Sequence, residues 1–231
     1  IVIIGGGPAG LMAAEAAVAA GVTVDVYDSM PSVGRKFLLA GKGGLNLTHS
    51  EPMESFLSRY GARRAFIAPA VRSFPPAALQ RWAHELGVGT FVGTSGRIFP
   101  VDLKAAPLLR LWLRRLRLHG VRFHVRHRWC GWDEQGGLRF MNSEGTAAVQ
   151  ADAVVLALGG GSWPQLGSDA GWMKLLSERH VPIIPLQPAN CGFNVQWSEH
   201  FREKFSGHPV KTVALVVKHR DGRTVRCMGE C

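Results

Sequence analysis

The chain opens with Ile1-Val2-Ile3-Ile4-Gly5-Gly6-Gly7-Pro8-Ala9-Gly10, and an alanine-rich stretch then leads to Val24-Asp25-Val26-Tyr27-Asp28. The apolar, β-branched start predicts a buried strand, and the alanine-rich stretch predicts a helix. Residues 22–27 predict a second strand, which ends on Asp28. A strand, a glycine turn, a helix and another strand form the opening unit of a doubly wound α/β fold with a parallel sheet.

The three glycines of Gly5-x-Gly7-x-x-Gly10 each have a physical role. The first permits a tight turn, the second lets a pyrophosphate approach the backbone, and the third lets helix and strand pack closely. The helix that begins around Pro8 and Ala9 offers free N–H groups to the phosphates. Asp28 follows the glycines by roughly 20 residues, where a carboxylate reaches a ribose hydroxyl. A glycine turn in an ordinary α/β protein is the alternative, but the combination favours dinucleotide binding.

The bulk composition indicates a folded protein. Of the 231 residues, 46% are hydrophobic, so the chain can bury a substantial core in one large domain or somewhat more. No apolar run reaches the roughly 20 residues that a membrane span needs. The chain begins inside a strand without Met or a charged leader, and we interpret it as a fragment of a longer protein.

Cysteine usage predicts a reducing compartment, hence a cytoplasmic protein. The four cysteines are scattered and form no CxxC pair: Cys130, Cys191, Cys227 and Cys231. No His or Cys partners stand at ligand spacing from them, so no metal site is expected.

The formal net charge is +10, and arginines concentrate between residues 110 and 128. Leucines fall near helical spacing in this region with arginines between them, which predicts an amphipathic helix with a solvated basic face; these leucines are Leu108, Leu111, Leu113, Leu116 and Leu118. Binding to a nucleic acid or to a membrane surface is the alternative for such a face, and a solvated face is the favoured interpretation.

The middle of the chain predicts further α/β structure. Residues 51 to about 87 predict helices interrupted at Pro69 and at Pro75-Pro76. Residues 153–158 predict a fully buried parallel strand, since they are continuously apolar. The remaining predicted strands are residues 121–128, which continue the parallel sheet, and residues 136–141 and 147–150, which form a small antiparallel excursion.

The end of the chain predicts a different architecture. Residues 213–217 and 224–227 predict a β-hairpin, with Asp221-Gly222 as its turn. We therefore expect an incomplete α/β domain over residues 1–186 and the truncated start of an inserted, antiparallel β-rich domain over residues 187–231.

Three stretches carry a more specific resemblance. Residues 34–48 read GRKFLLAGKGGLNLT, residues 96–100 read GRIFP, and residues 156–164 read LALGGGSWP. Together with the opening unit they resemble the BaiN/RdsA-type family of NAD(P)/FAD-dependent oxidoreductases. This family has the glutathione-reductase-type FAD fold and includes aminoacetone oxidases and uncharacterised bacterial flavoproteins. The resemblance implies a Rossmann-like FAD-binding domain with FAD as cofactor.

Carried over by position, the resemblance places Asp28 on the adenosine ribose and the following basic residues along the pyrophosphate and ribityl chain. It places the glycine-rich stretch near the flavin ring, with Lys42 supplying positive charge, and a residue near Trp129 beside adenine. Leu158 stands where the family usually has Thr. The implied cofactor-binding set is Gly5, Gly7, Pro8, Ala9, Gly10, Asp28, Arg35, Lys36, Gly41, Gly43, Gly44, Asn46, Trp129, Ala157, Gly159 and Gly160.

The resemblance implies an FAD-dependent oxidoreductase that transfers hydride between the flavin and a small-molecule substrate, as an NAD(P)H-fed reductase or as an oxidase. The alternative is a flavin-bearing regulatory or nucleic-acid-associated protein, including a tRNA-modifying enzyme. Arg97 is a candidate for steering the substrate, and the start of a helix at Asp169 is a second source of positive potential near the flavin. His49 is the nearest candidate for covalent flavin attachment, although a loop histidine that contacts backbone is the favoured interpretation. Catalytic residues, substrate and oligomeric state are not identified by the sequence.

Overall fold

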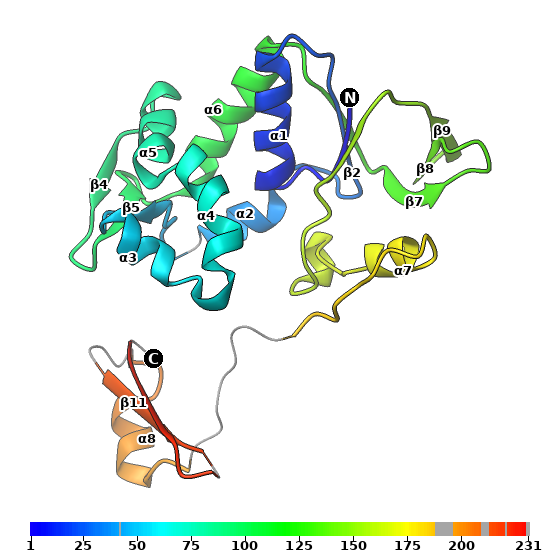
Figure 1. Ribbon diagram of the computed structural model, residues 1–231. Helices are drawn as coiled ribbons and strands as arrows, with labels where there is room; N and C mark the ends of the chain where they lie inside the picture. Colours follow the sequence, from blue (N-terminus) through cyan, green and yellow to red (C-terminus); the bar gives the residue numbers. More distant parts are fainter. Residues whose placement is uncertain (42, 188–195, 209–212, 220, 230–231) are drawn as a thin grey trace. The chain divides into compact units, whose positions relative to one another are not determined.

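The computed structural model describes residues 1–41, 43–187, 196–208, 213–219 and 221–229 (Figure 1). The chain divides into two compact units, Ile1–Leu186 and Gln187–Cys231. Their assignment as separate domains of a longer protein stays a prediction.

The first unit is built on a four-stranded parallel sheet with the order β10-β1-β2-β6. Its strands are β1 (Val2–Ile4), β2 (Asp25–Asp28), β6 (Arg122–Val125) and β10 (Val154–Leu156). Helix α1 (Pro8–Ala19) connects β1 to β2, which run parallel with Val2 opposite Asp25. The parallel Rossmann-like arrangement predicted from the opening residues is therefore confirmed.

The two faces of this sheet bury different layers, because successive side chains of a strand point to opposite sides. Ile3 packs in a core with Leu11 of α1 and with Leu108 of α6 (Ala105–Leu118). Val2 and Ile4 pack on the other face in a smaller core that contains Trp129, Leu138 and Phe140. That second face is covered by a three-stranded antiparallel sheet and by α7 (Trp172–Ser177). The sheet consists of β7 (Arg128–Trp132), β8 (Leu138–Asn142) and β9 (Gly145–Val149), and confirms the small antiparallel excursion.

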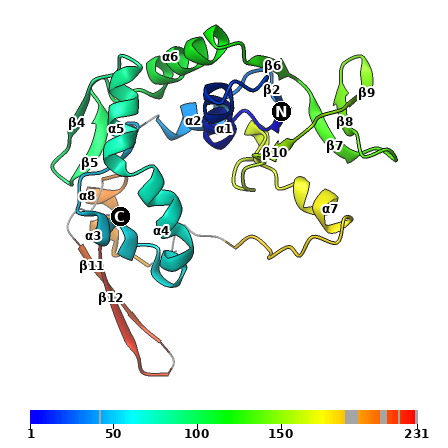
Figure 2. The same ribbon diagram turned by 45° about the horizontal axis from the view of Figure 1, so that its top comes forward.

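A mainly helical segment lies between β2 and α6 (Figure 2). It contains α2 (Arg35–Ala40), α3 (Met53–Ser58), a 3₁₀ turn (Gly61–Arg63), α4 (Arg64–Ser73) and α5 (Pro76–Glu85). Strands β3 (Thr48–His49), β4 (Thr90–Val92) and β5 (Arg97–Pro100) form a three-stranded sheet with the order β3-β5-β4. The helices between residues 51 and 87 were expected, whereas α2 was not. The interruption predicted at Pro69 was wrong, since this residue lies inside α4. Pro76 instead begins α5, where a missing N–H costs nothing.

Two predicted strands differ from the structure. The strand predicted over 121–128 is divided, because Arg126 has a positive φ of 57° that no continuous strand can accommodate. Trp129 consequently belongs to β7 of the antiparallel sheet. The strand predicted over 153–158 is not fully buried: Val154 and Leu156 are 38% and 39% exposed. The reason is that β10 is an edge strand, paired only with β1 among the described residues.

The buried side of α6 differs in part from the set of leucines predicted to form it. Its most buried side chains are those of Leu108, Leu109, Trp112 and Leu116, whereas Leu118 is 76% exposed. The predicted basic face is confirmed for exposed arginines of this helix, but Arg115 is an exception. It forms an ion pair with Glu15 of α1, and the side chains of both residues are about four-fifths buried.

The second unit contains α8 (Glu199–Phe205) and the hairpin of β11 (Val213–Lys218) and β12 (Thr224–Gly229). The strands pair antiparallel with Lys218 opposite Thr224, so the hairpin around Asp221-Gly222 is confirmed. Helix α8 begins after Ser198, whose hydroxyl accepts the Phe201 N–H, and was not expected from the sequence. No helix in the described parts of the chain has the length and apolar character needed to cross a membrane.

Candidate functional site

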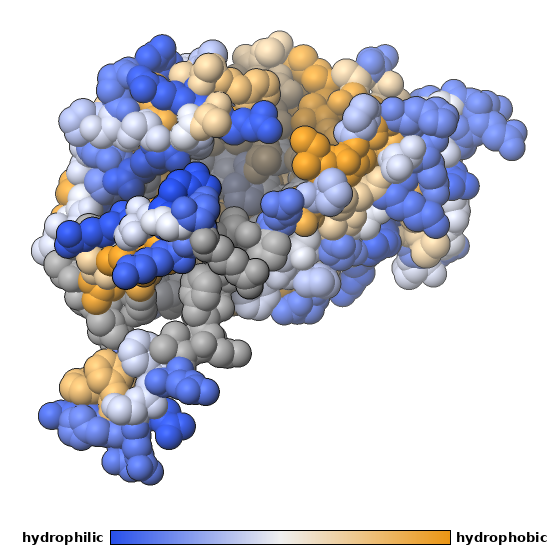
Figure 3. Space-filling view, turned by 60° about the horizontal axis from the view of Figure 1, so that its bottom comes forward, coloured by the Kyte–Doolittle hydropathy of each residue, from blue (hydrophilic) through white to orange (hydrophobic). Residues whose placement is uncertain are grey.

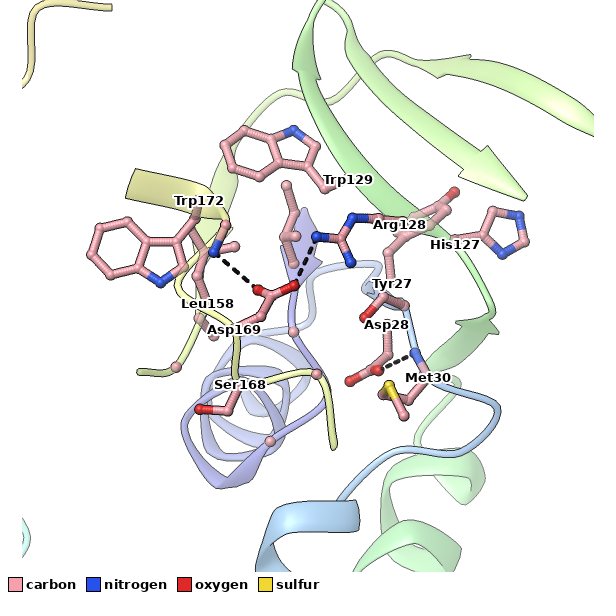
Figure 4. A pocket seen from close by; sticks show the side chains of 18 of the residues that line it. Tyr27, Asp28, Met30, His127, Arg128, Trp129, Leu158, Ser168, Asp169 and Trp172 are labelled. Atoms are coloured by element: carbon pink, nitrogen blue, oxygen red, sulfur yellow. Dashed lines mark hydrogen bonds and ion pairs between the residues drawn. The ribbon is translucent and has the colours of Figure 1, made fainter. Parts of the chain in front are cut away.

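A pocket of about 380 Å³ lies at the carboxyl ends of the parallel strands in the first unit. The neighbours of β1 are β2 on one side and β10 on the other, so the pocket opens where the strand order reverses. Crevices at such points are where open α/β sheets bind ligands. The pocket is lined by Ile4, Gly5, Gly7, Pro8, residues 27–30, Lys36, residues 127–130, residues 157–159, residues 166–169, Gly171, Trp172, Lys174 and Leu175 (Figure 4).

The opening glycines separate into two kinds. A Cβ on Gly5 would collide with the Ala157 carbonyl oxygen, and a Cβ on Gly10 would collide with the Gly5 carbonyl oxygen. Gly5 also has a φ of 109°, which favours glycine. Around a Cβ on Gly7, in contrast, no protein atom lies within 4 Å. Gly5 and Gly10 thus serve packing, whereas Gly7 leaves open space at the start of α1 that a ligand can fill.

Asp28 is held at the end of β2 by backbone groups. Its carboxylate accepts the N–H of Gly6 at 2.7 Å and the N–H of Met30 at 2.8 Å, and the side chain lines the pocket. Burial raises the pKa of this carboxyl above 3.8, and this effect outweighs the two N–H bonds and the Arg35 charge, which lower it. A half-buried carboxylate beside a glycine turn is suited to accept ribose hydroxyls, and the ribose contact itself stays a prediction.

The raised pKa of Asp28 predicts a pH dependence of stability for the cofactor-free protein. The folded state holds the Asp28 proton more tightly than the unfolded chain, so this group costs stability as the pH rises from 3.8 through its raised pKa. We expect Asp28→Asn to remove that component, so that the difference in Tm between parent and variant changes as the pH rises from 3.8 through the raised pKa and is constant at higher pH. Thermal unfolding at a series of pH values measures it, and a constant difference over the whole range contradicts it.

Lys36 joins α2 to the loop that follows β10. Its Nζ donates to the Ser162 Oγ at 2.7 Å and to the Ser168 Oγ at 3.2 Å, and the Ser168 side chain is buried. Lys36 lines the pocket, as do Gly7 and its hydrogen-bond partner Ser168. Arg35 does not line it, and its Nη1 lies 3.5 Å from the Ser32 Oγ.

Half of the predicted cofactor-binding residues come together at this pocket: Gly5, Gly7, Pro8, Asp28, Lys36, Trp129, Ala157 and Gly159. The others, of which Ala9 and Gly160 directly follow lining residues, do not line it: Ala9, Gly10, Arg35, Gly41, Gly43, Gly44, Asn46 and Gly160. Gly41 lies where α2 meets α6, and a Cβ there would lie 2.5 Å from the Ala105 Cβ. Its small size therefore has a packing explanation. The predicted flavin contacts of the glycine-rich stretch stay predictions, and Lys42 lies outside the described residues.

The structure adds contacts at the pocket that the sequence did not indicate. Tyr27 stacks between His124 and Phe140, with ring centroids 4.3 Å and 4.2 Å apart. Arg128 of β7 donates to Asp169 at 2.8 Å, and the other Asp169 oxygen accepts the Gly171 N–H at 2.9 Å (Figure 4). The helix expected from Asp169 begins instead at Trp172. No local pattern could have found this ion pair, because its two residues are 41 positions apart.

The Arg128–Asp169 ion pair connects β7 to the segment before α7 beside the pocket, and we expect it to slow the release of a bound dinucleotide. Its side chains are 56% and 32% exposed, so the contribution should not exceed about 1 kcal/mol, or roughly a fivefold change in rate. Arg128→Met and Asp169→Asn should each accelerate FAD release several-fold in stopped-flow fluorescence, and the double variant should add little. Arg59→Met, which breaks an ion pair with Glu51 away from the pocket, is the matched control. Equal rates for all variants would exclude this role.

Two other candidate residues lie outside the pocket. The His49 Nε2 lies 3.0 Å from the Ser95 carbonyl oxygen and its Nδ1 accepts the Glu51 N–H at 3.1 Å. His49 therefore contacts backbone as expected, although it lies in β3 and not in a loop. Arg97 is exposed at the start of β5, and its predicted role toward a substrate stays a prediction. Within the described residues, no three His, Cys, Asp or Glu side chains are placed to hold a metal ion.

Comparison with known proteins decides the family. Residues 1–225 match the family described as the HI0933-like protein Rossmann domain. The chain belongs to this family. The HI0933-like family consists of FAD-dependent oxidoreductases, and the membership confirms the BaiN/RdsA-type resemblance of the sequence.

Two curated relatives have functional names. The chain is 25% identical over 223 residues to a ribosomal RNA dihydrouridine synthase of Haemophilus influenzae, covering 94% of this chain and 55% of the relative. It is 30% identical over 191 residues to a 3-dehydro-bile acid delta(4,6)-reductase of Clostridium scindens, covering 81% of this chain and 45% of the relative. The chain thus spans about half the length of the curated relatives it matches.

The fold is also shared with a solved flavoenzyme. A flavocytochrome c3 fumarate reductase in its open conformation superposes with a TM-score of 0.55 at 18% identity. The match covers 69% of this chain and 33% of the flavocytochrome. At this identity the likeness concerns the fold, and it agrees with the Rossmann-like sheet described above.

Proposed function

We propose that this chain forms the part of an FAD-dependent oxidoreductase that binds the ADP half of FAD, and that the complete protein transfers hydride between the flavin and a small-molecule substrate. The observation that carries the proposal is the pocket at the strand-order reversal. There Gly7, with open space around it, and the half-buried Asp28 carboxylate both line the same pocket. Membership of the HI0933-like family supports the identity of the cofactor.

The residues present fit the nucleotide. Backbone N–H groups at the start of α1, beside Gly7, would hold the pyrophosphate, because neither a capping side chain nor a Cβ blocks them. The Asp28 carboxylate would accept hydroxyls of the adenosine ribose. The Lys36 ammonium would supply positive charge beside the phosphates. Bound FAD supplies the two-electron redox chemistry, and the protein supplies binding and orientation.

We further propose that the complete protein works in the reductive direction, with NAD(P)H as electron donor. The relative from Clostridium scindens supports this proposal, because it is named a reductase. In such a reaction the nicotinamide loses a hydride, and the substrate gains a hydride and a proton. The oxidase alternative would pass the same two electrons to O₂.

A spectrum of the full-length protein tests this proposal. Visible flavin absorbance that persists through gel filtration and bleaches on anaerobic addition of NADPH or NADH is the expected result. Absorbance that does not bleach would overturn the NAD(P)H-fed reductase. Absence of flavin after reconstitution with FAD would overturn the cofactor assignment itself.

A second candidate function is the reduction of a base in RNA. The observation that favours it is the formal net charge of +10, which attracts polyanions. The relative from Haemophilus influenzae, with ribosomal RNA in its printed name, supports the same candidate. NAD(P)H oxidation that is stimulated by RNA and not by small unsaturated carbonyl compounds is the result that would favour this second function over the first.

A further inference from the structure

The basic segment over residues 103–132 is only partly explained by the fold. It contains Lys104 and seven arginines but no Asp or Glu. Three of its arginines form ion pairs with acidic residues from elsewhere in the chain, namely Arg115, Arg122 and Arg128. These three arginines contribute to the structure or to the pocket. Their ion pairs do not explain why the segment carries four further arginines.

Three of the other arginines share one face of α6. Arg110, Arg114 and Arg117 are spaced by four and three residues, which places them on the same side of a helix. This side is opposite the buried stripe that contains Trp112 and Leu116. Helix α6 lies at the outside of the first unit, with α1 and α5 toward its inner side (Figure 2).

The outer face of α6, defined by Arg110, Arg114 and Arg117, is exposed and carries uncompensated charge. Over the described part of the chain, none of the three forms an ion pair. The Arg117 guanidinium lies over the Phe123 ring at 5.3 Å and so has a packing role. Arg110 and Arg114 have no such contact, and like charges four residues apart on a helix repel. These two charges therefore remain without a partner among the described residues and are accessible to an external anion.

We propose that the outer face of α6 binds the phosphate backbone of an RNA strand. Three guanidinium groups spread over about 10 Å of helix match a polymer with regularly repeated negative charges. An anionic membrane surface fits less well, because interfacial helices insert a broad apolar face. The outer face of α6 offers Leu118 as its one strongly exposed leucine. The proposed RNA-binding surface rests on the second candidate function, reduction of a base in RNA. Binding is measured without turnover, so that a failure of RNA binding can be distinguished from a failure of the proposed reaction.

Binding of fluorescein-labelled single-stranded RNA to the purified, FAD-loaded protein, followed by anisotropy between 50 and 200 mM KCl, tests the surface. Each lost phosphate contact should reduce the slope of log K against log salt by about 0.7. The double variant Arg110→Gln/Arg114→Gln should therefore lower the slope by about 1.4 and the affinity at 0.1 M salt by about 25-fold. The matched control is Arg63→Gln/Arg139→Gln, which removes the same net charge from exposed positions on other elements.

A second variant separates binding from folding. Arg114→Glu places a carboxylate between Arg110 and Arg117, so it should abolish RNA binding while raising Tm by about 1–2 °C. A lower Tm would show that Arg114 is structural and would overturn the proposal. The proposal is equally overturned if the parent does not bind RNA at 50 mM salt, or if both double variants weaken binding alike. It also fails if vesicles with 30% phosphatidylserine bind through these arginines in preference to RNA.

Discussion

Replacing Gly7 by alanine is expected to weaken FAD binding about 100-fold while leaving the unfolding free energy close to that of the parent. No protein atom lies within 4 Å of a Cβ at this position, so the fold has room for a methyl group. A pyrophosphate at the start of α1 would need the same space, and losing its backbone hydrogen bonds costs about 2–3 kcal/mol. Titration of the apoprotein with FAD, followed by flavin fluorescence, measures the affinity.

The neighbouring glycines provide the contrast that makes this result interpretable. Gly10→Ala would bring a Cβ into the Gly5 carbonyl oxygen and should cost at least about 2 kcal/mol of folding stability. Its loss of FAD affinity would accompany a lower Tm, whereas that of Gly7→Ala would not. If Gly7→Ala bound FAD as tightly as the parent, the pyrophosphate could not lie at this turn. If it lowered Tm as much as Gly10→Ala, the open space would not exist.

Replacing Glu15 by alanine is expected to destabilise the first unit by about 2–4 kcal/mol. The Glu15 carboxylate accepts the indole N–H of Trp82 at 3.1 Å, the indole N–H of Trp112 at 2.6 Å and an Arg115 N–H at 2.8 Å. The substitution would leave two indole donors and a mostly buried guanidinium without their acceptor. Urea unfolding followed by tryptophan fluorescence measures the loss, because both indoles report on this cluster.

Glu54 offers the matched control for this prediction. Its carboxylate also forms ion pairs with two arginines, Arg64 and Arg72, but its side chain is 61% exposed to water. Solvent screens such a pair, so Glu54→Ala should leave the urea midpoint close to that of the parent. Equal midpoints for the Glu15 and Glu54 variants would mean that burial of the Glu15 cluster contributes nothing to stability.

The parallel sheet and its ligand edge could be predicted because they depend on local sequence. The β-branched start, the glycine spacing and Asp28 lie within a single strand–turn–helix–strand unit. Strand propensity, a turn that demands glycine and a carboxylate at a strand end act over a few residues each. The hairpin around Asp221-Gly222 was predictable for the same reason, since a two-residue turn signal lies between two apolar runs.

The rest of the site could not be predicted because it depends on segments far apart in the chain. Part of the pocket wall comes from residues 127–130, 166–169, 171, 172, 174 and 175, and these segments come together because the antiparallel sheet and α7 pack against β1 and β2. The exposure of β10 likewise follows from its position at the sheet edge, which an apolar run does not reveal. On the face of the first unit that Figure 3 shows, hydrophobic residues form a patch with hydrophilic residues around it.

Glu15 shows this division in a single residue. In the sequence it is a charge within an alanine-rich helix, and its only visible effect is to break an apolar run. In the structure it is the common acceptor for side chains 67, 97 and 100 positions away. By itself the sequence determined where the sheet begins, which family the chain resembles and which acid is the candidate for the nucleotide ribose, because each depends on neighbouring residues. Only the tertiary structure decided which charges are neutralised and which remain exposed, because charge pairing depends on which distant segments fold against one another.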